Sequence, residues 1–218
     1  MKKQWYKTFM THSRTEPYRT KLEEANQIIK SVQGKAYVAF SGGKDSLCVL
    51  SLVSQIRGNI PVMHQDFGRQ KVPYYLEKET EEIAYKFTTN YRVFKTMNDN
   101  LGASYKKLFG EIIPSYVKAG YEICFLGLRK EESSHRRIRI KNNINLSQIK
   151  EIYPIQNWSW LDVWAYIVSN NLPYLSIYDK YGDVLGWDKV RYSTFFQFER
   201  FGNQNIDGVL MWRFRNAK

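Results

Sequence analysis

Hydrophobic residues alternate between helical and strand-like spacing along most of the chain. Apolar residues recur three and four positions apart from Leu22 to Val32 and stop before Gly34, which predicts an amphipathic helix with a glycine end. Short apolar runs predict strands at residues 36–40, 60–64, 91–94 and 122–127. Helical stretches are expected at residues 47–57, from Pro73 to Phe87, and, broken at Gly110, Pro114 and Gly120, before the last strand. The pattern predicts a three-layer α/β fold, with a mostly parallel, twisted sheet and helices on both faces.

The second half of the chain has weaker periodicity. Ser159-Trp160-Leu161-Asp162 is a capping-box signal for a helix that runs to about Asn170. From Pro173 onward aromatic residues are frequent but follow no clean period, which predicts an irregular tail wrapped around the domain. We therefore expect one domain at residues 1–186, with its core at about 36–180, and a basic aromatic tail at residues 187–218 packed on it.

The first predicted strand leads into Ser41-Gly42-Gly43-Lys44-Asp45-Ser46, which we call the glycine-rich loop. In a parallel sheet this loop lies at the carboxyl end of a strand, where its amides and the next helix N-terminus face one point. The glycines allow close approach to a polyanion, and Lys44, expected to be an exposed loop lysine, adds positive charge. Neither the P-loop spacing nor the dinucleotide-binding spacing is present. The loop predicts phosphate binding, against the alternative of a glycine turn with surface charges.

Charge strengthens the expectation of an anionic partner. The chain has 33 Lys and Arg against 21 Asp and Glu, a formal net charge of +12. This excess favours nucleotides, nucleic acid or an acidic protein as partners. Residues 128–150 are especially basic, and residues 187–218 mix cations with aromatics, a combination that suits single-stranded nucleic acid. Aromatics in the core with cations as their solvated neighbours would give the same pattern.

Cysteine content and hydropathy argue against several classes of protein. Cys48 and Cys124 are the only cysteines, and each lies in an apolar run, as expected of a buried thiol. Two cysteines are too few for an iron-sulfur cluster or an all-cysteine zinc site, so we predict no structural metal. The sequence has no apolar run of membrane-spanning length and no signal peptide, so we expect a cytoplasmic protein without a membrane partner.

Four ordered motifs resemble one enzyme superfamily. The glycine-rich loop resembles the pyrophosphate loop, or PP-loop, of ATP pyrophosphatases and other adenine nucleotide alpha-hydrolase-like enzymes. The segment from Gly127 to Arg136 resembles the Gly-x-Arg-x-x-(Glu/Gln)-Ser-x-x-Arg segment of the phosphoadenylyl-sulfate (PAPS) reductase family. His64-Gln65-Asp66-Phe67-Gly68, followed by Pro73, resembles that family's Asp-Thr-Gly turn, with Phe67 in place of threonine. Residues 153–179 resemble its next block, which the small subunit of ATP sulfurylase shares.

The resemblance implies an adenine nucleotide as ligand, either ATP or an adenylyl sulfonucleotide, with Mg²⁺. It gives Lys44, Asp45 and Arg129 as candidate catalytic residues. The candidate nucleotide-binding residues are Ser41, Gly42, Gly43, Lys44, Asp45, Ser46, Asp66, Gly68, Gly127, Arg129, Ser133 and Arg136. The two arginines could present forked donors to phosphate or sulfate oxygens. Asp45 or Asp66 could hold the nucleotide-bound Mg²⁺, and Asp66 could instead accept from a ribose hydroxyl or cap a turn.

One departure from the resembled reductases affects the expected reaction. Those enzymes use a nucleophilic cysteine in a C-terminal tail, whereas residues 187–218 contain none. We therefore favour an enzyme that directs a nucleophile at the α-phosphate of ATP, releases pyrophosphate and transfers the adenylyl group. The alternative is a non-catalytic nucleotide-sensing or nucleic-acid-associated module of a DNA-modification or phage-defence system. The choice between ATP and a sulfonucleotide, the acceptor substrate and the oligomeric state, a homodimer included, stay open.

Overall fold

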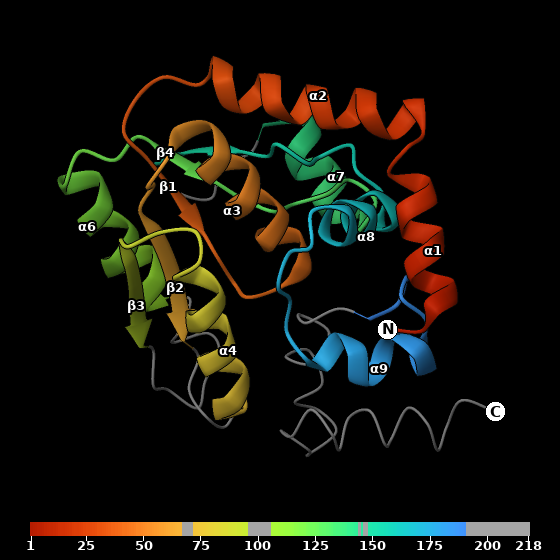
Figure 1. The fold of residues 1–218 in the computed structure, drawn as a ribbon. Coiled ribbons are helices and arrows are strands. Elements are labelled where there is room, and N and C mark those ends of the chain that lie inside the picture. Colours follow the sequence, from red (N-terminus) through yellow and green to blue (C-terminus); the bar gives the residue numbers. More distant parts are fainter. Residues whose placement is uncertain (67–71, 96–105, 144, 146–147, 191–218) are drawn as a thin grey trace.

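A five-stranded parallel sheet forms the centre of the computed structural model, which describes residues 1–190 apart from 67–71, 96–105, 144 and 146–147 (Figure 1). The strands lie in the order β3-β2-β1-β4-β5. Their bounds are β1 (Ala36–Ala39), β2 (Val62–Asp66), β3 (Tyr91–Lys95), β4 (Ile123–Phe125) and β5 (Lys150–Ile152). The predicted α/β fold with a parallel sheet is confirmed.

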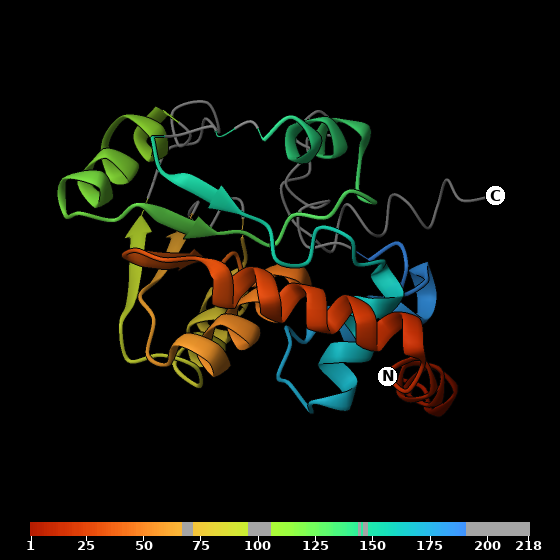
Figure 2. The ribbon, with the colours of Figure 1, turned by 90° about the horizontal axis from the view of Figure 1, so that it is seen from above.

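Helices cover both faces of this sheet (Figure 2). Their bounds are α1 (Lys3–His12), α2 (Glu16–Ser31), α3 (Lys44–Arg57), α4 (Tyr74–Ala84), η1 (Leu108–Ile112), α6 (Ile113–Lys118), α7 (Ser134–Lys141), α8 (Trp160–Ser169) and α9 (Ile177–Leu185). One face carries α2, α3 and α8, and the other carries α6 and α7. The three layers expected from the sequence are therefore present.

Alternate side chains of the central strands are buried on opposite faces. Val38 and Phe125 belong to the larger hydrophobic cluster, which α3 and α8 also line. Tyr37 and Cys124 belong to a smaller cluster on the opposite face, which α6 closes. A strand covered on both faces has a continuous apolar sequence, which explains why the central strands were visible as short hydrophobic runs.

The capping box predicted at the start of α8 is confirmed. Ser159 Oγ accepts from the Asp162 amide, and the Asp162 carboxylate accepts from the Ser159 amide. The same carboxylate is hydrogen-bonded to His12 Nε2 and Lys21 Nζ, each at 2.7 Å. These contacts link α8 to α1 and α2.

Part of the expected irregular tail is wrong. Residues 177–185 form α9, although the aromatic residues from Pro173 onward follow no clean period. A Cβ on Gly182 would lie 2.6 Å from the Trp187 ring, so the glycine makes room for this indole. The described part of the predicted tail, up to Val190, is buried at Trp187 and Val190. Residues 191–218 lie outside the described residues.

Candidate functional site

The glycine-rich loop lies where the strand order of the sheet reverses. From β1 the chain proceeds to β2 and β3 on one side, and β4 and β5 lie on the other. The loop leaves the carboxyl end of β1, and the segment from Gly127 leaves that of β4, its parallel neighbour. In open α/β sheets, ligands bind in the crevice at this switch point.

The loop is braced by its own serines. Ser46 Oγ donates to the Gly43 carbonyl at 2.9 Å and accepts from the Ser41 amide at 3.2 Å. Gly43 is the N-cap of α3 and has no side chain to satisfy the amides of the first helical turn. These amides and the helix dipole make this end of α3 suitable for phosphate.

Lys44, Asp45 and Arg129 form a buried charged cluster behind the loop. Lys44 Nζ lies 3.0 Å from Asp45 Oδ2, and Arg129 Nε donates to Asp45 Oδ1 at 2.6 Å. Lys44 is 2% exposed and Arg129 is 1% exposed. The expectation of an exposed loop lysine is therefore wrong, because an adjacent carboxylate compensates a buried ammonium group.

The fork of Arg129 is directed at groups of the protein itself. Besides Asp45, it donates through Nη1 to Glu131 at 2.6 Å and to the Trp158 carbonyl at 3.3 Å. The expectation that this fork faces a phosphate does not match these contacts. Burial alone would lower the pKa of Arg129, but the carboxylates of Asp45, Glu132 and Glu131 outweigh it and raise the pKa. Arg129 thus orders Asp45 and joins the loop to the segment before α8.

Gly127 lies directly against the start of α3. A Cβ at this position would lie 2.6 Å from the Ser46 amide nitrogen and 2.7 Å from the Asp45 carbonyl carbon. Both are backbone atoms, so no rotamer change could relieve the clash. Glycine at this position allows the segment after β4 to approach the glycine-rich loop.

Two contacts with the loop were not anticipated from the sequence. The Lys44 amide donates to the hydroxyl of Tyr178, on α9, at 3.0 Å. Gly42 has a φ of +79°, and a Cβ there would lie 2.4 Å from Thr80 Oγ1, on α4. Ile177, Tyr178 and Tyr181 are buried at helical spacing, the signal that could have placed Tyr178 on a helix.

The other sequence-derived candidates are less closely associated with the loop. Ser133 Oγ accepts from the Arg136 amide as the N-cap of α7, and the Arg136 side chain pairs with Glu132. Asp66 is the last residue of β2. Gly68 lies outside the described residues. The structure therefore brings together Ser41–Ser46, Gly127 and Arg129, and gives Ser133 a local role as a cap.

The family model of the phosphoadenosine phosphosulfate reductase domain matches residues 35–203. The chain belongs to this family. Adenosine 5'-phosphosulfate reductase 2 of Bacillus subtilis strain 168 is 27% identical over 170 residues, covering 70% of each chain. Protein MJ0066 of Methanocaldococcus jannaschii is 28% identical over 178 residues, and the match spans only 36% of that longer protein.

Solved structures agree on the fold of this PAPS reductase family member. The PAPS reductase of Candida auris, in a phosphate complex, has a TM-score of 0.52 at 16% identity, over 75% of this chain and 88% of that chain. The U34-tRNA thiolase NcsA of Methanococcus maripaludis, with its [4Fe-4S] cluster, has a TM-score of 0.53 at 13% identity, over 72% and 67%. The family resemblance inferred from the motifs is confirmed.

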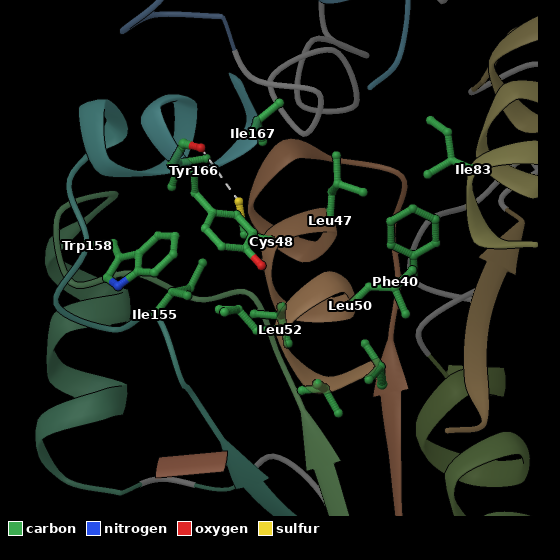
Figure 3. Close-up of a cluster of buried hydrophobic side chains, with 14 of the residues drawn as sticks. Phe40, Leu47, Cys48, Leu50, Leu52, Ile83, Ile155, Trp158, Tyr166 and Ile167 are labelled. Carbon is green, nitrogen blue, oxygen red and sulfur yellow. Dashed lines mark hydrogen bonds between the residues drawn. The ribbon is translucent and has the colours of Figure 1, made fainter. Parts of the chain in front are cut away.

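Both thiols of this family member are buried, as predicted. Cys48 lies within α3, where its Sγ donates to the Val163 carbonyl at 3.7 Å among apolar side chains (Figure 3). Burial raises the pKa of Cys48 well above its usual value and that of Cys124 to about 12. Neither group is an accessible thiolate.

In residues 1–190, apart from the gaps given above, no group of three or more His, Cys, Asp or Glu side chains is arranged to hold a metal ion. Both oxygens of Asp45 already bind cationic side chains, so this carboxylate does not fit as a ligand of nucleotide-bound Mg²⁺. Within the same residues, no helix is long and apolar enough to cross a membrane.

The charged cluster predicts a specific loss of stability in acid. Burial alone would raise the pKa of Asp45, but Lys44 and Arg129 outweigh it and lower the pKa from 3.8 to about 2. The resulting stabilisation is complete above pH 3.8 and is lost as the pH falls through 2. We expect wild type to lose about 2 kcal/mol more than Asp45→Asn between pH 5 and pH 2, measured by urea unfolding. Parallel stability curves for the two proteins would contradict this assignment.

Proposed function

We propose that the chain binds an adenine nucleotide at the glycine-rich loop and acts on the α-phosphate of ATP. The observation that carries this proposal is the position of the loop, at the switch point of the sheet and at the N-terminus of α3. Lys44 and Arg129 lie beside it, and Asp45 and Glu131 balance their charges, so the attraction for a polyanion comes from the amides and dipole of α3. Membership of the PAPS reductase family supports an adenine nucleotide as the ligand.

In the proposed reaction, an oxygen nucleophile forms a bond to the α-phosphorus, and the bond to the bridging oxygen breaks. Pyrophosphate leaves with the electron pair of that bond, and the adenylyl group remains on the nucleophile. The first-turn amides of α3 would hold the leaving pyrophosphate, with Lys44 stabilising its charge. Nucleotide-bound Mg²⁺ would supply further charge neutralisation, with Asp66 as its remaining candidate protein ligand.

The thiols support this reaction over reduction of a sulfonucleotide. The relatives named above include reductases, and reduction by a thiol requires a thiolate that reaches the sulfur atom. Cys48 and Cys124 are both buried, and burial raises the pKa of each thiol. We therefore propose that this chain does not reduce a sulfonucleotide through either of its cysteines.

The experiment that tests this function measures the product of each candidate reaction, pyrophosphate for adenylyl transfer and sulfite for reduction. With ATP and candidate acceptors we expect pyrophosphate, and with adenylyl sulfate, thioredoxin and reductant we expect no sulfite. Lys44→Ala should weaken ATP binding at least about tenfold in calorimetry, because it removes a positive charge beside the first-turn amides that would hold the phosphates. It should also lower stability, since Lys44 is buried beside Asp45.

Lys118→Ala is the matched control, because Lys118 is exposed on α6, on the other face of the sheet. We expect its ATP affinity to equal that of wild type. The double variant Cys48→Ala, Cys124→Ala should also retain nucleotide binding. Sulfite release that disappears with either cysteine would overturn the proposed reaction, and equal ATP affinity for Lys44→Ala and Lys118→Ala would remove the loop from the site.

A second candidate function is a nucleotide-binding module without turnover. It is favoured by a surface pocket of about 340 Å³ beside the site, where Lys130 and Arg137 outnumber the single carboxylate of Glu131. Such a surface suits an anionic macromolecule. Tight ATP binding without pyrophosphate release, whatever acceptor is supplied, would favour this module over the enzyme.

A further inference from the structure

The hydroxyl of Tyr178 is hydrogen-bonded to one of the backbone amides at the start of α3. It accepts from the Lys44 amide at 3.0 Å, although 134 residues separate the two positions. Lys44 is the first residue of α3, so its amide has no partner within the helix. A side chain from α9 therefore satisfies a donor of the turn that we assign to phosphate binding.

We propose that Tyr178 is a positioning residue of the nucleotide site. By holding the Lys44 amide, it fixes the first turn of α3 in the orientation that directs its other amides at the phosphates. This inference rests on the proposed function. Several amides must face one phosphate together, so a small rotation of the turn weakens all of these bonds at once.

The surroundings of Tyr178 give its hydroxyl a fixed position. The side chain is 1% exposed, and its ring packs edge-to-face on Trp164 with centroids 5.2 Å apart. Tyr174 packs on the same indole at 5.3 Å. A rigid aromatic anchor loses little conformational entropy when it holds a backbone amide, so it suits a positioning role.

A second contact holds α9 against α4 beside the loop. The Ser176 amide and hydroxyl both donate to the Glu79 carboxylate, at 2.8 and 2.6 Å. The next residue of α4, Thr80, lies against Gly42. Helices α4 and α9 therefore hold each other, and each also contacts the glycine-rich loop. Glu79 keeps Tyr178 in register through Ser176.

The first test needs no ligand and compares Tyr178→Phe with Tyr166→Phe. Both changes remove one buried hydroxyl, but Tyr166 lies within hydrogen-bond distance of Ser51 and Gln55, farther along α3. We expect hydrogen exchange of the Lys44 amide to accelerate about fivefold in Tyr178→Phe and not in Tyr166→Phe. Unchanged exchange at Lys44 in Tyr178→Phe would overturn the proposal.

The second test separates positioning of phosphate from general stability. In Tyr178→Phe, we expect the affinity for ATP and for inorganic pyrophosphate to fall about fivefold, while the affinity for adenosine stays unchanged. Tyr166→Phe should alter none of these affinities. A fall for adenosine equal to that for ATP, or no fall for ATP, would overturn the positioning role.

Glu79→Ala provides an independent route to the same result. Like Tyr178→Phe, it should weaken ATP binding. The double variant should bind ATP little more weakly than Tyr178→Phe alone, because both changes act through the contact of Tyr178 with the Lys44 amide. Full additivity of the two changes would contradict this coupling. Wild-type protein that binds neither ATP nor pyrophosphate would overturn the proposed function, whereas the exchange measurement at Lys44 would still decide whether Tyr178 holds the loop.

Discussion

Arg129→Met is expected to lower the free energy of unfolding by about 3 kcal/mol, measured by urea denaturation at pH 7. The change keeps much of the side-chain volume but removes the guanidinium that binds Asp45 and Glu131. Asp45 is largely buried, so losing one of its two cationic partners is costly. Nucleotide affinity should fall as well, because Asp45 is no longer held on both sides.

Arg137→Met is the matched control for this change. Arg137 is exposed on α7, and an exposed arginine of this kind contributes little to stability. We expect its free energy of unfolding to stay within about 0.5 kcal/mol of wild type. Equal stabilities for Arg129→Met and Arg137→Met would show that the buried cluster contributes nothing to folding.

Gly127→Ala is expected to cost about 2 kcal/mol of stability and to weaken ATP binding by at least about tenfold. The added methyl group would meet the backbone of Asp45 and Ser46 at 2.6–2.8 Å, so the segment after β4 and the glycine-rich loop must separate. Calorimetric titration with ATP and thermal unfolding would measure the two effects.

Gly110→Ala serves as the control, because a Cβ at Gly110 meets nothing within 4 Å. Gly110 lies in the helical turn η1, where alanine is preferred to glycine, so this variant should be at least as stable as wild type. If Gly127→Ala behaved like Gly110→Ala in both assays, the close approach at Gly127 would be irrelevant to the site.

Local sequence signals were sufficient for four of the five strands and for the position of the loop, whereas β5, with two charged residues among its three, was not predicted. The strands β1, β2 and β4 appeared as short apolar runs because helices cover both faces of the sheet. The glycine-rich loop was predicted because its position depends only on the strand before it and the helix after it. Gly127 became a candidate site residue only through the family resemblance, because no local signal relates it to the glycine-rich loop.

Contacts between distant segments were not predictable in the same way. Lysine and arginine are usually exposed, and the burial of Lys44 and Arg129 depends on their sharing Asp45, with 84 residues between Asp45 and Arg129. Helix α7 was missed because its basic sequence has little apolar periodicity. Its cap, Ser133, was interpreted as a ligand contact, since a cap and a phosphate donor have the same residue preferences.

The distances along the chain between the loop and its partners affect how ligand binding is detected. Asp45 and Lys44 meet partners 84 and 134 residues later, so long chain loops must close before the site is complete. The site is therefore complete only when β4 and α9 are both in place. A nucleotide that binds only this form stabilises the entire fold by mass action, and the shift in Tm grows with its concentration. Thermal-shift screening of nucleotides would thus report on the whole domain, even though the proposed site lies only at the carboxyl ends of the strands.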